Sequence, residues 1–213
     1  MTGIPADRRL VTLFQSATDA ELDYGLTWYA DAHEQLRSIA AEHGVSVDTA
    51  AAVTAALSPQ TNWPDNLNKT RQLLATGDTY GFRLGRGRAQ RVVAGEAPLD
   101  VLGGPKVRAF YSNLADPVGS DAVTVDRHAV DAALGFVGDD NSRKRILERK
   151  GGYEGIADAY RSAARVLGVK PHVVQAVVWA VWRNRFGRYH YQRLGNESQN
   201  ESVEALGRQE ATT

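Results

Sequence analysis

Helix start and stop signals recur along this chain and constrain its fold more than any other sequence feature. Residues 18–21, TDAE, have the form of a capping box, in which a threonine and a glutamate satisfy N–H groups at a helix start. Apolar residues in 22–39 then recur at helical spacing, and Gly44 provides a stop. Ser46 and Pro64 mark two further helix starts. These repeated start and stop signals predict a chain built mainly from helices.

The second half of the chain has the same organisation. The predicted helices lie over residues 107–114, 153–167 and 171–185. The only stretch with strand propensity, AVTV at 122–125, is four residues long. We therefore predict an all-α fold of eight to ten helices, followed by a flexible polar tail over residues 188–213.

The composition limits the classes of protein to which the chain can belong. It has no cysteine, which excludes disulfides, thiolate metal sites and iron–sulfur clusters. No apolar stretch approaches the roughly 18 residues that span a bilayer, and the N-terminus lacks the apolar core of a signal peptide. We therefore expect a cytoplasmic protein with no membrane partner.

The charge is balanced overall but unevenly distributed. The 25 basic and 25 acidic residues give a net charge of zero, which argues against a polybasic nucleic-acid coat. Residues 1–75 carry nine acidic and five basic groups, whereas residues 76–110 carry three acidic and six basic groups. This pattern fits either a basic face on one side of the protein or an ordinary solvated surface.

Sequence patterns for common cofactors are missing. The chain has no phosphate-binding Walker loop, no dinucleotide fingerprint and no G-x-S-x-G nucleophile turn. Its histidines, aspartates and glutamates lack the spacing of a metal site; His33 and His43, for example, stand ten residues apart. We expect no cofactor and no metal.

Three short motifs follow one another in the middle of the chain. They are Leu57-Ser-Pro-Gln-Thr61, Gly103-Gly-Pro-Lys106 and Val125-Asp-Arg-His128. Their order and spacing, over residues 49–135, resemble the helix-hairpin-helix DNA glycosylase superfamily, and its endonuclease III-like group in particular. The glycine-rich hairpin is shorter than the family's L-x-G-V-G-x-K form, and Pro105 removes one backbone N–H from it.

The resemblance implies a single two-lobed helical domain over residues 1–187. Residues 49–125 would form a central lobe with the hairpin, and residues 1–48 with 126–187 would form the second lobe. The implied partner is double-stranded DNA, from which a modified base is flipped out before its N-glycosidic bond is cleaved. Whether the enzyme also cuts the strand at the abasic site, and its oligomeric state, stay open.

The resemblance also assigns roles to individual residues. Asp126 would be the essential carboxylate, because positive charge that builds up on the sugar requires an anion nearby. Lys106 would be the nucleophile of a lyase step, which requires a neutral amine and therefore a desolvated or cationic setting. Gln60 would enter the gap left by the base, and Trp63 and Tyr111 would stack on bases. The residues expected to contact DNA are Gln60, Asn62, Trp63, Arg86, Arg88, Arg91, Gly103, Gly104, Arg108, Tyr111, Arg127 and His128.

Other interpretations of the same residues stay open. Asp126 also fits the role of a simple helix cap. Lys106 also fits the role of a solvated lysine in the first turn of a helix. Trp179 and Trp182, three residues apart on one helix face, suit an apolar core. The compact size and the divergent hairpin resemble small phage-encoded proteins. This resemblance gives an alternative enzyme, a transferase or pyrophosphorylase-like activity on a modified pyrimidine, which would need Asp126 and no Lys106 nucleophile. The third alternative is a non-catalytic DNA-binding module.

Overall fold

The computed structural model of the protein describes residues 5–194, with side chains up to residue 187. These residues form eleven α-helices and no strand, so the all-α prediction is confirmed. The helices are α1 (Ala6–Gln15), α2 (Asp19–His43), α3 (Val47–Leu57), α4 (Trp63–Thr76), α5 (Arg83–Val93), α6 (Pro98–Val101), α7 (Pro105–Ala115), α8 (Arg127–Leu134), α9 (Asp140–Glu148), α10 (Gly152–Leu167) and α11 (Pro171–Leu194). Their number exceeds the expected eight to ten because the single-turn α6 and the short polar α9 lack the apolar repeat that marks a helix in a sequence.

The predicted helix ends are largely the observed ones. The Thr18 hydroxyl accepts a hydrogen bond from the Glu21 N–H, and the Glu21 carboxylate accepts one from the Thr18 N–H. Gly44 ends α2 in the left-handed conformation, with φ at +65°. The Ser46 side chain caps α3, and Pro64 lies in the first turn of α4, which is capped by Asn62, a residue predicted to contact DNA. Each of these signals acts within one helical turn, so the sequence alone identifies it.

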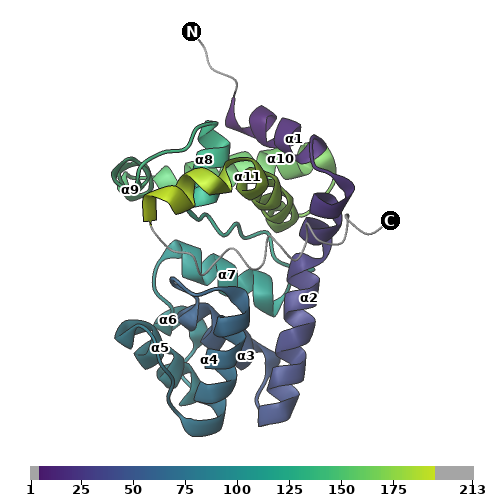
Figure 1. Ribbon diagram of the computed structural model, residues 1–213. Helices are drawn as coiled ribbons and strands as arrows, with labels where there is room; N and C mark the ends of the chain where they lie inside the picture. The colour runs from purple at the N-terminus through teal and green to yellow at the C-terminus, as the bar shows by residue number, and fades with distance from the viewer. Residues whose placement is uncertain (1–4, 195–213) are drawn as a thin grey trace.

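Figure 1 shows an upper and a lower group of helices joined by the long helix α2. The upper group contains α1 and α8–α11, and its core includes Leu10, Tyr160 and Trp182, the last as predicted. The lower group contains α3–α7, and its apolar clusters include Leu73 and Leu102. Each group therefore has an apolar core of its own, and α2 connects the two.

Helix α2 contributes to both groups. Its C-terminal half buries Leu36 and Ile39 in the lower group, whereas its N-terminal half packs along α11. At Gly25 the two helices approach so closely that an added Cβ would lie 2.4 Å from the Val177 side chain. A larger residue at this position would push α11 away from α2, so the glycine determines how the upper group meets the long helix.

The last helix extends into the segment predicted to be a polar tail. Helix α11 continues to Leu194, so residues 188–194 belong to a helix, while residues 195–213 lie outside the described residues. The segment 188–194 contains no proline or glycine, and adding residues to a helix that packing already stabilises costs little free energy. The prediction, which relied on polar composition alone, therefore placed the end of this helix too early.

Candidate active site and nucleic-acid interface

The extended segment 116–126 runs between helices of both groups. The Tyr29 hydroxyl on α2 lies 3.1 Å from the Thr124 hydroxyl and 3.2 Å from the Gln175 amide oxygen on α11. From α7, the Asn113 amide donates a hydrogen bond to the Thr124 hydroxyl at 3.3 Å. Burial raises the pKa of Tyr29 to about 12, so its hydroxyl remains a hydrogen-bond donor. These buried contacts hold the segment in place before it enters α8.

Asp126 stands at the end of this segment and caps α8, as its sequence context predicts. Its carboxylate oxygen Oδ1 accepts a hydrogen bond from the Ala129 N–H at 2.8 Å, and the side chain is half-buried. Within the described part of the chain, the other oxygen, Oδ2, accepts no hydrogen bond. A cap of this kind fixes the carboxylate in one orientation and uses only one of its two oxygens.

Tyr153 on α10 holds the residues that precede Asp126. Its hydroxyl donates a hydrogen bond to the Val123 carbonyl at 2.7 Å and accepts one from the Val125 N–H at 3.2 Å. Burial is the main reason that the pKa of Tyr153 is raised to about 12, so the hydroxyl keeps its proton at neutral pH. The upper group therefore positions Asp126 from two sides, through its own helix and through α10.

Lys106 lies in the first turn of α7, directly after Pro105. A proline suits the first helical position because the N–H of that residue has no partner within the helix. The Lys106 side chain is exposed, and in the region covered by the structure no hydrogen bond or ion pair joins it to Asp126 or to any other residue. Burial, which would favour the neutral amine of a lysine nucleophile, is therefore absent at this position.

The glycine hairpin before α7 is held by two arginines. A Cβ on Gly103 would lie 2.3 Å from the Arg88 guanidinium, so this side chain packs directly on the hairpin backbone. The Arg108 guanidinium donates a hydrogen bond through Nε to the Leu102 carbonyl at 2.8 Å. Gly104 has φ at +72°, in the left-handed region that favours glycine. Both predicted phosphate contacts, Arg88 and Arg108, thus also stabilise the hairpin.

Gln60 lies on the short loop between α3 and α4. Its φ is +57°, and among the described residues it is the only non-glycine residue with a positive φ. The side chain is exposed, while the Thr61 N–H donates a hydrogen bond to the Ser58 carbonyl at 3.2 Å and closes the turn. Such backbone outliers concentrate where a structure presents a residue to a ligand. The loop therefore displays the glutamine that the motif predicts to enter DNA.

A second exposed loop packs against this one and was not predicted as part of the site. Phe82 is 56% exposed, and with Pro59 and Thr61 it lines a small pocket between the two loops. Gly85 allows α5 to approach α3, since an added Cβ would lie 2.6 Å from the Ala56 carbonyl oxygen. The sequence signal was the apolar residues of TYGFRL, which have no helical or strand repeat that would bury them.

The arginines of α5 have different surroundings. Arg86 pairs with Asp78 at 3.2 Å, and Arg91 pairs with Glu96 at 2.5 Å. Arg83, which the sequence analysis did not select, is exposed and forms no ion pair within the described residues. A phosphate must compete with a carboxylate at Arg86 and Arg91, so Arg83 is the more available cation beside Phe82.

The two aromatic residues predicted to stack on bases make contacts within the protein. The Trp63 ring packs 5.3 Å from that of Trp28, and its Nε1 donates a hydrogen bond to the Gln35 amide oxygen at 3.1 Å. The Tyr111 hydroxyl donates a hydrogen bond to the Asp48 carboxylate at 2.5 Å, and burial, followed by this contact, raises the pKa of Tyr111. Both rings help to hold the lower group together.

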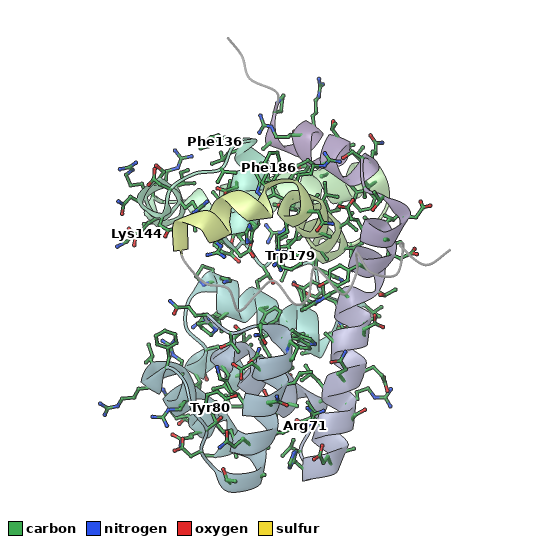
Figure 2. All side chains as sticks on the ribbon, viewed as in Figure 1. Arg71, Tyr80, Phe136, Lys144, Trp179 and Phe186 are labelled. Carbon is green, nitrogen blue, oxygen red and sulfur yellow. The ribbon has the colours of Figure 1, made fainter. Side chains whose placement is uncertain are left out.

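A different aromatic residue lies beside the Asp126 motif. Trp179 on α11 is half-buried, so the prediction that it belongs to the core is only partly correct. The buried His128 ring meets the indole edge-on, with centroids 6.3 Å apart, and Arg127 donates a hydrogen bond to His128 at 3.3 Å. The Arg183 guanidinium lies 4.5 Å from the indole centroid, and the Tyr24 ring lies nearly parallel to it. Figure 2 shows Trp179 on the side of α11 that faces α7.

The described residues, 5–194, contain neither a metal-binding cluster nor a membrane-spanning helix. No group of three or more histidine, aspartate or glutamate side chains has an arrangement that could hold a metal ion in this part of the chain. None of the helices described is both long enough and apolar enough to cross a membrane.

Comparison with known proteins identifies a family but no activity. No curated protein and no solved structure matches this chain. One family does match, over residues 3–186, and this range includes the three motifs, Asp126 and Trp179. The chain therefore belongs to the Family of unknown function (DUF7178).

Proposed function

We propose that this protein is an enzyme that cleaves the N-glycosidic bond of a flipped-out, modified base in DNA, on a two-lobed fold of the helix-hairpin-helix glycosylase type. The observation that carries the proposal is the state of Asp126. It is a half-buried carboxylate with one oxygen available, at the point where the segment between the helix groups enters α8. The order of the three motifs and the all-helical architecture support the same proposal.

The chemistry requires one carboxylate and one water molecule. The bond between the sugar C1′ and the base nitrogen breaks, and its electron pair leaves with the base, which takes up a proton. Water adds to C1′ and transfers its proton to the Asp126 carboxylate, which then releases it to the departing base or to solvent. Before that, the negative charge of Asp126 stabilises the positive charge that develops on the sugar. The products are the free base and an abasic sugar, and one water is consumed.

Two exposed loops of the lower group support a role in opening the duplex. Gln60 and Phe82 stand on adjacent loops, one polar and one apolar, and both side chains are exposed. An enzyme that flips a base must fill the gap and separate neighbouring bases, and apolar wedges do so in other DNA-bending proteins. Arg83 and the hairpin would hold the adjacent phosphates, an effect that weakens with salt.

The exposure of Lys106 favours chemistry without a lysine nucleophile. An amine attacks C1′ only in its neutral form, and water favours the charged form. The Asp126 carboxylate alone is sufficient for hydrolysis, and it is also sufficient for the second candidate, a transferase or pyrophosphorylase-like step on a modified pyrimidine. We therefore consider strand cleavage by Lys106 less well supported than either of these two activities.

Binding to abasic-site analogues tests the proposal without knowledge of the base. A duplex with a single pyrrolidine residue carries positive charge beside the C1′ position, whereas a tetrahydrofuran residue at the same place is neutral. We expect the wild type to bind the pyrrolidine duplex at least about tenfold more tightly, because the enzyme is complementary to the charged transition state. Asp126→Asn should lose this preference and still bind the tetrahydrofuran duplex.

Lys106→Ala is the matched control and should keep the full preference. Equal affinity of the wild type for the two duplexes would contradict glycosidic chemistry, and retained DNA binding would then leave the non-catalytic module. Borohydride trapping on a duplex with a natural abasic site tests the lyase step separately. A covalent adduct that disappears only in Lys106→Ala would restore Lys106 as a nucleophile.

A further inference from the structure

We propose that Tyr24, Trp179 and Arg183, here called the Trp179 platform, bind the flipped-out nucleobase by stacking. The inference rests on the proposed function and adds the residues that hold the base during the reaction. The ligand is a purine or pyrimidine ring that is still attached to its sugar and phosphate.

The platform is an aromatic surface that the fold leaves partly open. Trp182, on the same helix, is 3% exposed, whereas Trp179 is half-buried and Tyr24 is 36% exposed. The Tyr24 and Trp179 rings lie within 17° of parallel, with centroids 6.3 Å apart. Large apolar rings that face solvent beside a cation are typical of ligand sites, because burying them on binding is favourable.

Neighbouring groups keep the Trp179 ring in one orientation. The His128 ring supports it edge-on at 90°, and the Arg183 guanidinium lies over its face. The close crossing of α2 and α11 at Gly25 brings Tyr24 alongside. A ring that is ordered before binding loses little conformational entropy when a ligand stacks on it. The indole itself is therefore preorganised, and Arg183 is the group that has to move when a flat ligand binds.

The platform lies close to the proposed reacting carboxylate. His128, which contacts Trp179, is two residues from Asp126 and lies in the first turn of α8. Trp179 is on the side of α11 that faces α7 in Figure 2, which is the side of the upper group nearest the lower one in this view. The platform and Asp126 are therefore both linked to the first turn of α8, Trp179 through His128 and Asp126 as the cap.

The chemistry of the three side chains fits a nucleotide. An indole face stacks on any base, so the platform supplies affinity and not sequence readout. A guanidinium plane stacks on a base and also pairs with phosphate oxygens. Arg183 now covers the indole, and a base that takes this place would lie between Trp179 and the guanidinium or move Arg183 toward the phosphate.

Other aromatic residues are less suited to this role. The Trp63 indole donates its N–H to Gln35 and packs on Trp28, and the Tyr111 hydroxyl is bonded to Asp48. Neither contacts the Val125–His128 motif in the described residues. The platform contacts that motif through the His128 ring, whereas Tyr153 contacts it through the hydrogen bond from the Val125 N–H to its hydroxyl.

The test measures affinity for two duplexes that differ by one base. One carries an unpaired 2-aminopurine, and the other carries tetrahydrofuran at the same position and has no base to stack. We expect Trp179→Leu to weaken binding of the 2-aminopurine duplex about tenfold and to leave the tetrahydrofuran duplex unaffected. Leucine keeps an apolar side chain on α11, Trp179→Phe should restore most of the difference, and Trp63→Leu is the matched control.

The possible results distinguish failure of the platform from failure of the proposed function. Equal effects of Trp179→Leu on the two duplexes, or a selective effect of Trp63→Leu instead, would overturn the platform while leaving the proposed function intact. A wild type that binds neither duplex would overturn the proposed function and the platform together. Photo-crosslinking of the wild type to a single 5-iodouracil gives a readout that requires no variant. The adduct should map to Trp179 or Tyr24, and an adduct elsewhere would also overturn the platform.

Discussion

At the scale of single residues, Gln60 has the backbone conformation that its side chain least favours. A non-glycine residue in the left-handed region costs on the order of 1–3 kcal/mol when its surroundings impose it. The turn closed by the hydrogen bond from the Thr61 N–H to the Ser58 carbonyl imposes it here. The protein therefore gives up stability at an exposed position that makes no core contact.

Replacing Gln60 by glycine should stabilise the protein and weaken its action on DNA. Glycine adopts a positive φ without strain, so Gln60→Gly should raise the free energy of unfolding by about 1 kcal/mol, as measured by urea denaturation. Gln60→Ala should give no such gain, because alanine keeps the strain. Lower stability of the glycine variant would show that the backbone at Gln60 is not strained.

At the scale of secondary-structure elements, Lys69 on α4 joins the two exposed loops. Its ammonium group is 2.8 Å from the Asp65 carboxylate and donates a hydrogen bond to the Thr61 hydroxyl at 3.0 Å. It also lies 4.8 Å from the Tyr80 ring centroid, and Lys69 is only 7% exposed. One buried cation thus connects the loop that carries Gln60 to the loop that carries Phe82.

Removing this cation should loosen both loops without unfolding the core. We expect Lys69→Met to lower the free energy of unfolding by about 2 kcal/mol, since charge-assisted hydrogen bonds are lost at a buried position. Chymotrypsin should then cleave faster after Tyr80 or Phe82, which limited proteolysis with mass spectrometry detects. Lys69→Arg should restore part of the protection, and Lys144→Met, at an exposed position on α9, is the control. Unchanged cleavage would exclude this role for Lys69.

At the scale of the whole molecule, the junction of the two helix groups is polar and buried. His172, at the start of α11, is 2% exposed and meets the Tyr29 ring edge-on at 5.0 Å. Burial, followed by the charge of Lys170, lowers the pKa of His172 to about 4, although the Ser120 carbonyl and Asp121 act in the opposite direction. The junction therefore holds a histidine that stays neutral when the protein is folded.

This histidine should make the stability of the protein depend on pH. Between about pH 6.5 and pH 4 the unfolded chain binds a proton at His172 and the folded chain does not, so stability falls as the pH falls. The expected loss is on the order of 3 kcal/mol, present in full only near the lower end of this range. Urea denaturation at about pH 7.5 and about pH 4.5 measures it. His172→Gln should remove this part of the pH dependence, and an unchanged pH dependence would contradict the assignment.

Local signals made the helices, and several residues of the candidate site, predictable from the sequence. Thr18, Ser46 and Asp126 each cap a helix through a bond to a residue three positions away, so a stretch of four residues contains the whole interaction. The motif around Gln60 likewise predicted a short loop between two helices. The predicted end of α11 was wrong because the true end depends on packing as well as on composition.

Long-range packing determined the rest, because exposure depends on which distant residues cover a side chain. Trp179 and Trp182 have almost the same sequence context, yet the crossing of α2 and α11 at Gly25 leaves only the first partly open. Phe82 is exposed although its loop lies against the turn before α4. The sequence by itself determined the helices and the position of Asp126 in the chain, whereas the tertiary structure decided which aromatic rings remain accessible beside it.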